Sequence, residues 1–282
     1  MERVGSNVTQ FQVGDRVFGC SFFGAYSSRI LIPEAQLRPI PAQLSTTQAA
    51  SLPAVTLTAL YALFLAGHFP MPSKLRNQGI LIHSAAGGVG SMLVQLSKLL
   101  GLSPVVGVVG RTSKVEAAKS LGCDVVIDKS QQDLWEVALK AAPNGYSCVM
   151  DSNGVDTIEK SYAHLAMTGR LIVYGFHTNL PMGKDMLSPW EWIRMASKQQ
   201  RMPKFDAMEM GSENKAVLAF NLSFFSEERD MLADFFGIVL DWIRDGKLNC
   251  PQVAQFEGLD SISGAHDLIQ SGKSVGKLII KL

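Results

Sequence analysis

The chain has 282 residues, and its hydrophobic content of 47% is enough to build the core of one large or two ordinary domains. Its 26 basic and 25 acidic residues leave a formal net charge of +1, and no basic block marks a nucleic-acid or anionic-membrane surface. We therefore expect a small-molecule ligand and no nucleic-acid partner.

The cysteines and the N-terminal residues indicate the compartment. No Cys-x-x-Cys pair is present, which argues against a structural zinc site or a disulfide framework; the four cysteines are Cys20, Cys123, Cys148 and Cys250. Residues 1–7 lack the apolar region of a signal peptide, and the apolar stretch 57–69 is too short to span a bilayer. These features predict a reducing, cytoplasmic location and no transmembrane segment.

The N-terminal region is β-rich and loop-rich. Its sequence predicts short strands at 16–18 and 26–33. From 56 to 67 the pattern becomes helical, and residues 71–73 form a connector. We place a domain boundary near Thr56.

A strand, a glycine turn and a helix follow at residues 79–100. The apolar run 80–82 is typical of a strand buried on both faces, and apolar residues recur at helical spacing from Val89 onward. Between them, Ala85-x-Gly87-x-x-Gly90 matches the dinucleotide fingerprint with alanine at the first position. In that motif, Gly87 lets the backbone approach a pyrophosphate and Gly90 lets the helix lie close to the strand. A glycine triplet alone is weak evidence, so its context matters.

The context is a regular alternation of strands and helices. Strands are predicted at 105–109, 125–128, 148–151 and 171–174, and helices at 113–121, 133–142 and 155–167. This alternation implies an α/β fold, a doubly wound parallel sheet with helices on both faces. After His177 we expect a loop containing Pro181 and Gly183, a helix at 190–197 and a strand at 216–222; then a helix at 229–244, a strand at 253–256, a helix at 262–269 and a strand at 277–281.

The residues after the second strand indicate which dinucleotide binds. NAD-specific folds place an Asp or Glu there for the ribose hydroxyls, but residues 110–114 contain no carboxylate. Arg111 and Lys114, with the hydroxyls of Thr112 and Ser113, instead suit a 2′-phosphate through charge-assisted hydrogen bonds. We therefore favour NADPH over NADH, the alternative being that these cations are merely solvated surface charges.

Two later segments stand where open α/β sheets hold ligands, at the carboxyl ends of strands. They are Asp151-Ser152-Asn153-Gly154 and Tyr174-Gly175-Phe176. Either could be an ordinary turn by itself. Together with the fingerprint, they predict the walls of a dinucleotide groove.

The ordered set of motifs resembles the medium-chain dehydrogenases/reductases, in particular their zinc-free quinone oxidoreductase branch. The residues that carry this resemblance are Val13-Gly14-Asp15-Arg16-Val17, Ala25-Tyr26, Leu52-Pro53, Leu57-Thr58-Ala59, the segment from His83 to Gly90, and Val275-Gly276-Lys277. Phe220-Asn221-Leu222-Ser223 is similar to members near the vesicle amine transport protein homologues.

The resemblance implies a GroES-like catalytic domain joined to a Rossmann domain. It implies a partial GroES-like domain at 1–55, an NADP-binding Rossmann domain at 56–222 and a return to the catalytic domain at 223–282. It also implies NADPH-dependent reduction of quinones or α,β-unsaturated carbonyls, and a homodimer. The cofactor-binding residues expected from the motifs and the resemblance are Thr58, Ala86, Gly87, Gly88, Val89, Gly90, Arg111, Ser113, Lys114, Lys129, Asn153, Gly154, Tyr174, Gly175, Phe220 and Leu222. Lys129 stands where relatives often carry tyrosine.

No metal site is expected. Zinc-dependent relatives carry a catalytic cysteine at the domain entry and a four-cysteine lobe, and this sequence has neither. We interpret His68, His83 and His266 as structural.

The resemblance also implies that a sizeable N-terminal part of the catalytic domain precedes the position of Val4-Gly5 in family members. We expect that part to be missing here, so no catalytic donor can be named. An alternative hypothesis is therefore an NADP(H)-binding regulatory or adaptor protein with weak or no turnover.

Overall fold

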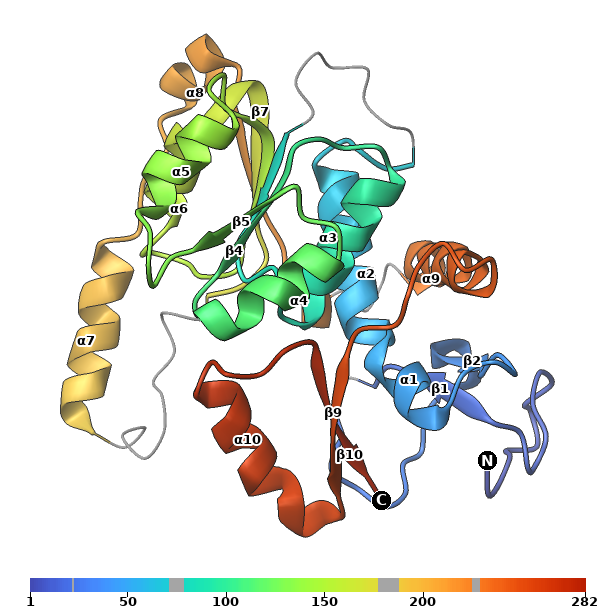
Figure 1. Ribbon diagram of the computed structural model, residues 1–282. Helices are drawn as coiled ribbons and strands as arrows, with labels where there is room; N and C mark the ends of the chain where they lie inside the picture. The colour runs from blue at the N-terminus through green and yellow to red at the C-terminus, as the bar shows by residue number, and fades with distance from the viewer. Residues whose placement is uncertain (22, 71–78, 177–187, 225–228) are drawn as a thin grey trace. The chain divides into compact units, whose positions relative to one another are not determined.

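The computed structural model describes residues 1–21, 23–70, 79–176, 188–224 and 229–282, and these form two compact units (Figure 1). One unit comprises Met1–Leu57 and Ser226–Leu282, and the other comprises Thr58–Phe225. The three domain assignments made from the sequence stay predictions.

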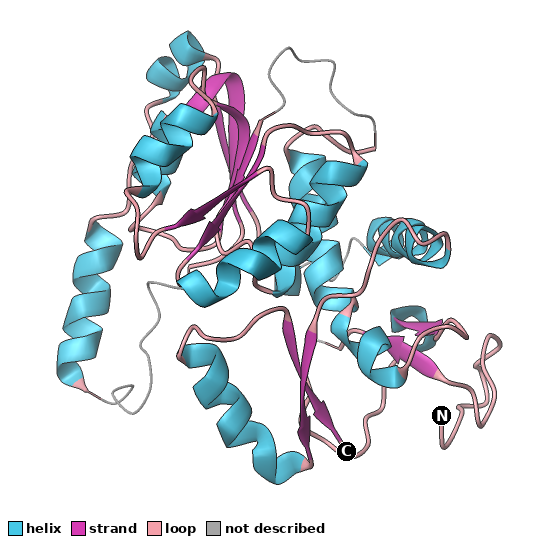
Figure 2. Ribbon diagram, in the orientation of Figure 1, coloured by secondary structure: helices cyan, strands magenta, loops and turns pink. Residues whose placement is uncertain are grey.

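Within the described part of Thr58–Phe225, six strands form one parallel sheet (Figure 2). The strands are β3 (Ile80–Ile82), β4 (Val105–Val109), β5 (Val125–Asp128), β6 (Tyr146–Asp151), β7 (Leu165–Val173) and β8 (Ala216–Ala219). Their order is β5-β4-β3-β6-β7-β8, which reads 3-2-1-4-5-6 when the strands are numbered within the sheet. This is the strand order of doubly wound dinucleotide-binding folds, so the predicted α/β fold is confirmed.

The central strands are apolar on both sides because helices cover both faces of the sheet. All three residues of β3 and all five of β4 are buried. Alternate residues such as Leu81, Val106 and Val149 pack with Ala138 and Ile158 from the helices into one buried cluster. The connecting helices are α3 (Gly88–Leu99), α4 (Val115–Ser120) after the short turn η2 (Thr112–Lys114), α5 (Leu134–Ala141) and α6 (Ile158–Ala163).

The other elements of this unit lie before β3 or after β7 in the sequence. Helix α2 (Pro53–Leu65) leads into the unit, α7 (Pro189–Gln200) and α8 (Ala207–Glu213) lie between β7 and β8, and the turn η5 (Leu222–Phe224) follows β8. The carboxylate of Asp206 caps α8 by accepting from the backbone N–H groups of Met208 and Glu209. Helix α8 is absent from the sequence prediction.

The other unit contains two separate strand pairs. Strand β1 (Val17–Gly19) pairs antiparallel with β2 (Leu37–Pro39), and β9 (Val253–Glu257) pairs parallel with β10 (Lys277–Lys281). The helices and turns are η1 (Glu34–Gln36), α1 (Thr46–Ser51), α9 (Arg229–Arg244), η6 (Leu259–Ser261) and α10 (Ile262–Gln270). The rings of Phe18 and Phe236, 5.2 Å apart, join β1 to α9.

The predicted strand at 26–33 is wrong. Residues 26–33 form bends and loop, and β1 pairs with β2 instead. Tyr26 has a φ of 61°, which an extended strand does not allow, and Leu31 is fully exposed. The apolar residues of this segment therefore have no strand partner to pack against.

The predicted helix at 155–167 is too long. Helix α6 ends at Ala163, and Leu165 already pairs with Tyr146 as the first residue of β7. Thr168 has a φ of 68°, and a Cβ on Gly169 would lie 2.8 Å from the carbonyl oxygen of Tyr146. The strand therefore forms around an irregularity that helical spacing in the sequence does not reveal. The predicted loop beginning at His177 and the connector at 71–73 lie outside the described residues.

Acid should destabilise the Thr58–Phe225 unit through His68, which follows α2. Burial, and secondly the charge of Arg170, lower the pKa of His68 from 6.5 to about 4. An unfolded chain therefore binds a proton that the folded chain does not, and the stability gained above pH 6.5 is lost as the pH falls toward 4. Over this window we expect a loss of roughly 3 kcal/mol in the free energy of unfolding. Urea denaturation at several pH values should show a weaker pH dependence for His68→Gln, and an unchanged dependence would contradict the prediction.

Candidate nucleotide-binding site

The turn between β3 and α3 is tight. Ser84 has a φ of 56°, and its carbonyl oxygen accepts a hydrogen bond from Gly87 N at 2.9 Å. A Cβ on Gly90 would collide with that carbonyl and would lie 2.8 Å from the Cα of Ala85. The absence of a side chain at Gly90 therefore lets α3 begin directly against the strand end, as the fingerprint predicts.

Helix α3 begins without a side-chain cap. Gly87 is the N-cap residue and supplies no side-chain acceptor, and the first turn contains no acidic residue. The N–H groups of a first helical turn have no partner within the helix, and the helix dipole makes this end electropositive. Such an end suits a phosphate group.

The sheet order brings other loops to this turn. Strand β3 lies between β4 and β6, and all three are parallel, so their carboxyl ends meet at one edge. Ligands of open α/β sheets bind at the position where the strand order reverses. The loops after β4 and β6 therefore flank the Ser84–Gly90 turn.

Three cations surround the ends of β4 and β5. Arg111 is exposed and Lys114 is half-buried; burial, and secondly the charge of Arg111, lower the pKa of Lys114. The Cε of Lys129 lies 3.6 Å from the position that a Cβ on Gly110 would take, so this side chain crosses the end of β4. The predicted residues Arg111, Lys114 and Lys129 thus share one region.

Thr112 links two loops at these strand ends, and its predicted contact with a 2′-phosphate stays a prediction. Its hydroxyl donates to Asp128 at 2.6 Å, and Ser130 donates to the same carboxylate through its N–H and its hydroxyl. These bonds lower the pKa of Asp128, and the bond from the Ser130 hydroxyl has the largest effect on it. Thr112 therefore joins the loops after β4 and β5, and the neighbouring Ser113 is exposed on η2.

Asp151 organises the loop after β6 from a fully buried position. Its carboxylate accepts from the backbone N–H groups of Asn153 at 2.8 Å and Gly154 at 3.2 Å. It also accepts from the hydroxyls of Thr157 at 2.7 Å and Ser161 at 2.8 Å. Gly154 has a φ of 100°, a conformation that favours glycine. The predicted residues Asn153 and Gly154 are therefore held by a carboxylate that the sequence placed only within a turn.

Aromatic side chains gather at the ends of β7 and β8. The ring of Phe220 lies 4.9 Å from that of Tyr61 and 6.4 Å from that of Tyr174. Burial raises the pKa of Tyr174 well above its usual range, so its hydroxyl stays protonated. A Cβ on Gly175 would lie 3.0 Å from the carbonyl oxygen of Ser152. The absence of a side chain at Gly175 therefore allows the loops after β6 and β7 to lie close together. Sequence reasoning missed Tyr61, whose position on α2 carried no distinguishing motif.

The predicted residues thus fall into groups along the strand ends, with two on other elements. Thr58 lies on α2 and Leu222 lies in η5; Ala86, Gly87, Gly88, Val89 and Gly90 form the turn and the start of α3. Their contacts with a cofactor stay predictions.

The three histidines interpreted as structural each make a polar side-chain contact. His68 and His83 are buried beside serines, and Nε2 of His266 lies 3.0 Å from the Tyr26 hydroxyl. Among the residues that the structure describes, no three His, Cys, Asp or Glu side chains come together to hold a metal ion. No helix in this part of the chain is long and apolar enough to cross a membrane.

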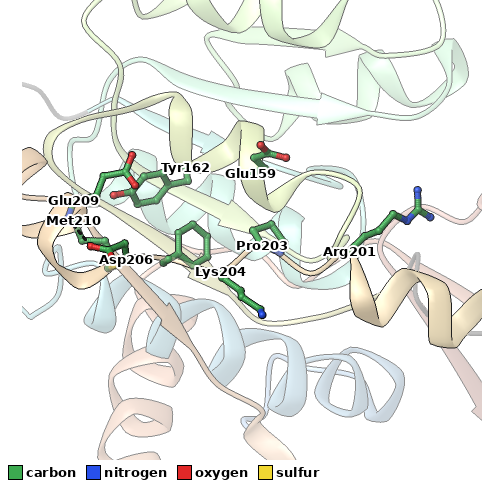
Figure 3. A pocket seen from close by; sticks show the side chains of 9 residues that line it. Glu159, Tyr162, Arg201, Pro203, Lys204, Asp206, Glu209 and Met210 are labelled. Atoms are coloured by element: carbon green, nitrogen blue, oxygen red, sulfur yellow. Dashed lines mark hydrogen bonds between the residues drawn. The ribbon is translucent and has the colours of Figure 1, made fainter.

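A pocket of about 300 Å³ lies elsewhere on the same unit (Figure 3). It is lined by Glu159, Tyr162, Arg201, Pro203, Lys204, Phe205, Asp206, Glu209 and Met210, none of which is a predicted site residue. Both acidic and basic side chains line it, and Asp206 is already the cap of α8. We place the candidate site at the strand ends, because the fingerprint, the uncapped helix and the cations meet there.

Replacing Gly90 tests the turn geometry. Gly90→Ala should displace α3 from the Ser84 carbonyl, destabilise the fold by about 1–3 kcal/mol and weaken dinucleotide binding. Gly211→Ala is the matched control, because a Cβ there meets nothing within 4 Å. Thermal unfolding and dinucleotide titration measure the two effects; a Gly90→Ala protein that matches the Gly211→Ala protein in both would contradict this role.

Comparisons with known proteins agree with the fold. The family described as zinc-binding dehydrogenase matches residues 88–200. The synaptic vesicle membrane protein VAT-1 homolog of Danio rerio is 29% identical over 280 residues, covering 99% of this chain and 55% of that protein. The 2-haloacrylate reductase of a Burkholderia species is 37% identical over 179 residues, covering 62% of this chain and 52% of that protein. The chain thus spans about half the length of these relatives.

Solved structures give the same result. The quinone oxidoreductase of Pseudomonas syringae pv. Tomato DC3000 matches with a TM-score of 0.78 and 27% identity, covering 100% of this chain and 79% of that one. The Escherichia coli quinone oxidoreductase complexed with NADPH matches with a TM-score of 0.80 and 25% identity, with the same coverage. Sequence similarity, strand order and fold therefore agree that the chain is similar to the quinone oxidoreductase-like medium-chain dehydrogenases/reductases.

Proposed function

We propose that this protein binds NADP(H) and transfers hydride from it to quinones or α,β-unsaturated carbonyls without zinc. The observation that carries the proposal is the meeting of the uncapped α3 N-terminus with the cations Arg111, Lys114 and Lys129 at one edge of the sheet. The E. coli quinone oxidoreductase structure, which holds NADPH, supports the choice of cofactor, and the 2-haloacrylate reductase supports an activated alkene as one acceptor class.

The strand ends offer a suitable partner for each part of NADP(H). The N–H groups at the start of α3 would hold the pyrophosphate, and the cations near β4 would hold the 2′-phosphate. The aromatic cluster of Tyr61, Tyr174 and Phe220 offers an apolar wall farther along the sheet. Residues 110–114 contain no carboxylate that would repel the 2′-phosphate.

The bound cofactor would supply a hydride, that is, two electrons and one proton, from its nicotinamide ring. Reduction of the acceptor would need one further proton, which solvent would supply. The contribution of the chain is to orient the reactants and keep the dinucleotide fixed. We also propose that the reaction needs no zinc, that the protein forms a homodimer and that it is located in the cytoplasm.

The cofactor preference can be tested at Lys114. Lys114→Met should weaken NADPH binding by about 10–100-fold, because a charge-assisted hydrogen bond contributes about 1.5–3 kcal/mol, and should leave NADH binding nearly unchanged. Lys119→Met is the matched control, since Lys119 lies on α4 and pairs with Glu116 at 2.8 Å. Titration followed by nicotinamide fluorescence gives both affinities. Equal losses for NADPH and NADH would contradict a 2′-phosphate contact.

Turnover requires a separate measurement. The purified chain should oxidise NADPH faster than NADH when naphthoquinone or a simple enone is present, and absorbance at the reduced nicotinamide band follows the reaction. A chain that binds NADPH tightly and oxidises none across a panel of quinones and enones would favour the alternative, a regulatory or adaptor protein of the same fold. Failure to bind NADPH would overturn both.

A further inference from the structure

Two buried histidines in the Thr58–Phe225 unit make similar contacts at different ends of the strands. Nε2 of His83 lies 3.1 Å from the hydroxyl oxygen of Ser161, and Nε2 of His68 lies 3.3 Å from that of Ser147. Both imidazoles have no exposed surface. His83 directly follows the carboxyl end of β3, whereas Ser147 lies near the amino end of β6.

The hydrogen bonds of the serines determine the protonation of each ring. The Ser161 hydroxyl donates its single proton to Asp151 at 2.8 Å, and the Ser147 hydroxyl donates to the carbonyl oxygen of Gly79 at 2.9 Å. Each serine oxygen can therefore only accept from its histidine, so Nε2 of His68 and of His83 must carry a proton. Nδ1 of each ring is then left as a buried acceptor, and neither Nδ1 has a hydrogen-bond partner in the structure.

The buried surroundings of His83 favour this neutral form. Burial, which is the largest effect, and the cation Lys129 lower its pKa, while the carboxylate of Asp151 raises it. Nε2 of His83 lies 3.7 Å from Oδ2 of Asp151, so the serine hydroxyl, and not a direct ion pair, makes the short contact. His83 therefore acts as a hydrogen-bond donor of fixed orientation.

We propose that His83 is a positioning residue, which through Ser161 and Asp151 fixes the Ser84–Gly90 turn relative to the loop that carries Asn153 and Gly154. The chain of contacts is continuous. His83 precedes Ser84 in the sequence, its ring donates to Ser161, and Ser161 donates to the carboxylate that also accepts from Asn153 and Gly154. The role rests on the proposed NADP(H) site, because it concerns the spacing of two loops that would hold one dinucleotide.

His68 provides the internal control. Its contact with Ser147 has the same chemistry and the same burial, but it connects the segment after α2 to Gly79, before β3 begins. Disturbing His68 should change stability as much as disturbing His83 does. Only His83 should affect the two loops.

Paired substitutions distinguish a specific donor from general packing. Glutamine can place an amide donor at the position of Nε2, whereas asparagine can place one only at the position of Nδ1. We expect His83→Gln to keep the NADPH affinity within about threefold and His83→Asn to weaken it about tenfold or more, as expected for a lost buried hydrogen bond. His68→Gln and His68→Asn should both bind NADPH like the native chain. Equal affinity of the two His83 variants, or an equal loss in His68→Asn, would overturn the positioning role.

The protonation of the ring can be measured without any cofactor. In the chain labelled with ¹⁵N-histidine, the signal that disappears in His83→Gln should show a protonated Nε2 and a bare Nδ1 at neutral pH. A protonated Nδ1 would overturn the proposal whatever the affinities.

If His83→Asn does not fold, Ser161→Ala gives the same test of affinity, with a loss expected. If the native chain does not bind NADPH, the proposed function fails together with the positioning role, whereas native binding that all His83 and Ser161 variants retain refutes the positioning role alone.

Discussion

The close approach of helix α3 to the end of strand β3 is the constraint on which the candidate site depends. Ser84 turns the chain with a positive φ, its carbonyl accepts from Gly87, and Gly90 has no side chain to meet that carbonyl. The unpaired N–H groups of the helix therefore point out at the edge of the sheet. Because β3 lies between β4 and β6, every other part of the site is placed relative to this turn.

The positively and the negatively charged side chains at this edge of the sheet differ in their surroundings. Arg111, Lys114 and Lys129 surround the ends of β4 and β5, while the carboxylates of Asp128 and Asp151 accept hydrogen bonds from the loops and the helix next to them. The negative charges therefore shape the loops, and the positive charges are the ones presented toward the edge. A ligand with phosphates at one end and a ring at the other suits this arrangement.

Local sequence patterns were sufficient to predict a helix, strand or turn where the residues that form it are close together in the sequence. The strand at 80–82 and the glycine turn were predicted with nearly their observed bounds, and the helix at 229–244 with the observed ones, because each depends on residues within a few positions. The strand at 26–33 and the helix at 155–167 failed because pairing partners decide strands. Leu165 follows helical spacing in the sequence, yet its pairing with Tyr146 makes it part of β7.

The sequence by itself determined the glycine turn, the alternation of strands and helices, and the cations at 111 and 114, since these are properties of short segments. Only the tertiary structure decided that Lys129 crosses the end of β4, that Tyr61 joins Tyr174 and Phe220, and that His83 contacts Ser161. The physical reason is that hydrogen bonds and ring contacts act over a few ångströms, and the fold brings together residues as far apart as 61 and 220 in the chain. A histidine next to a glycine motif looks the same in the sequence whether it is exposed or, as here, buried as a donor between two loops.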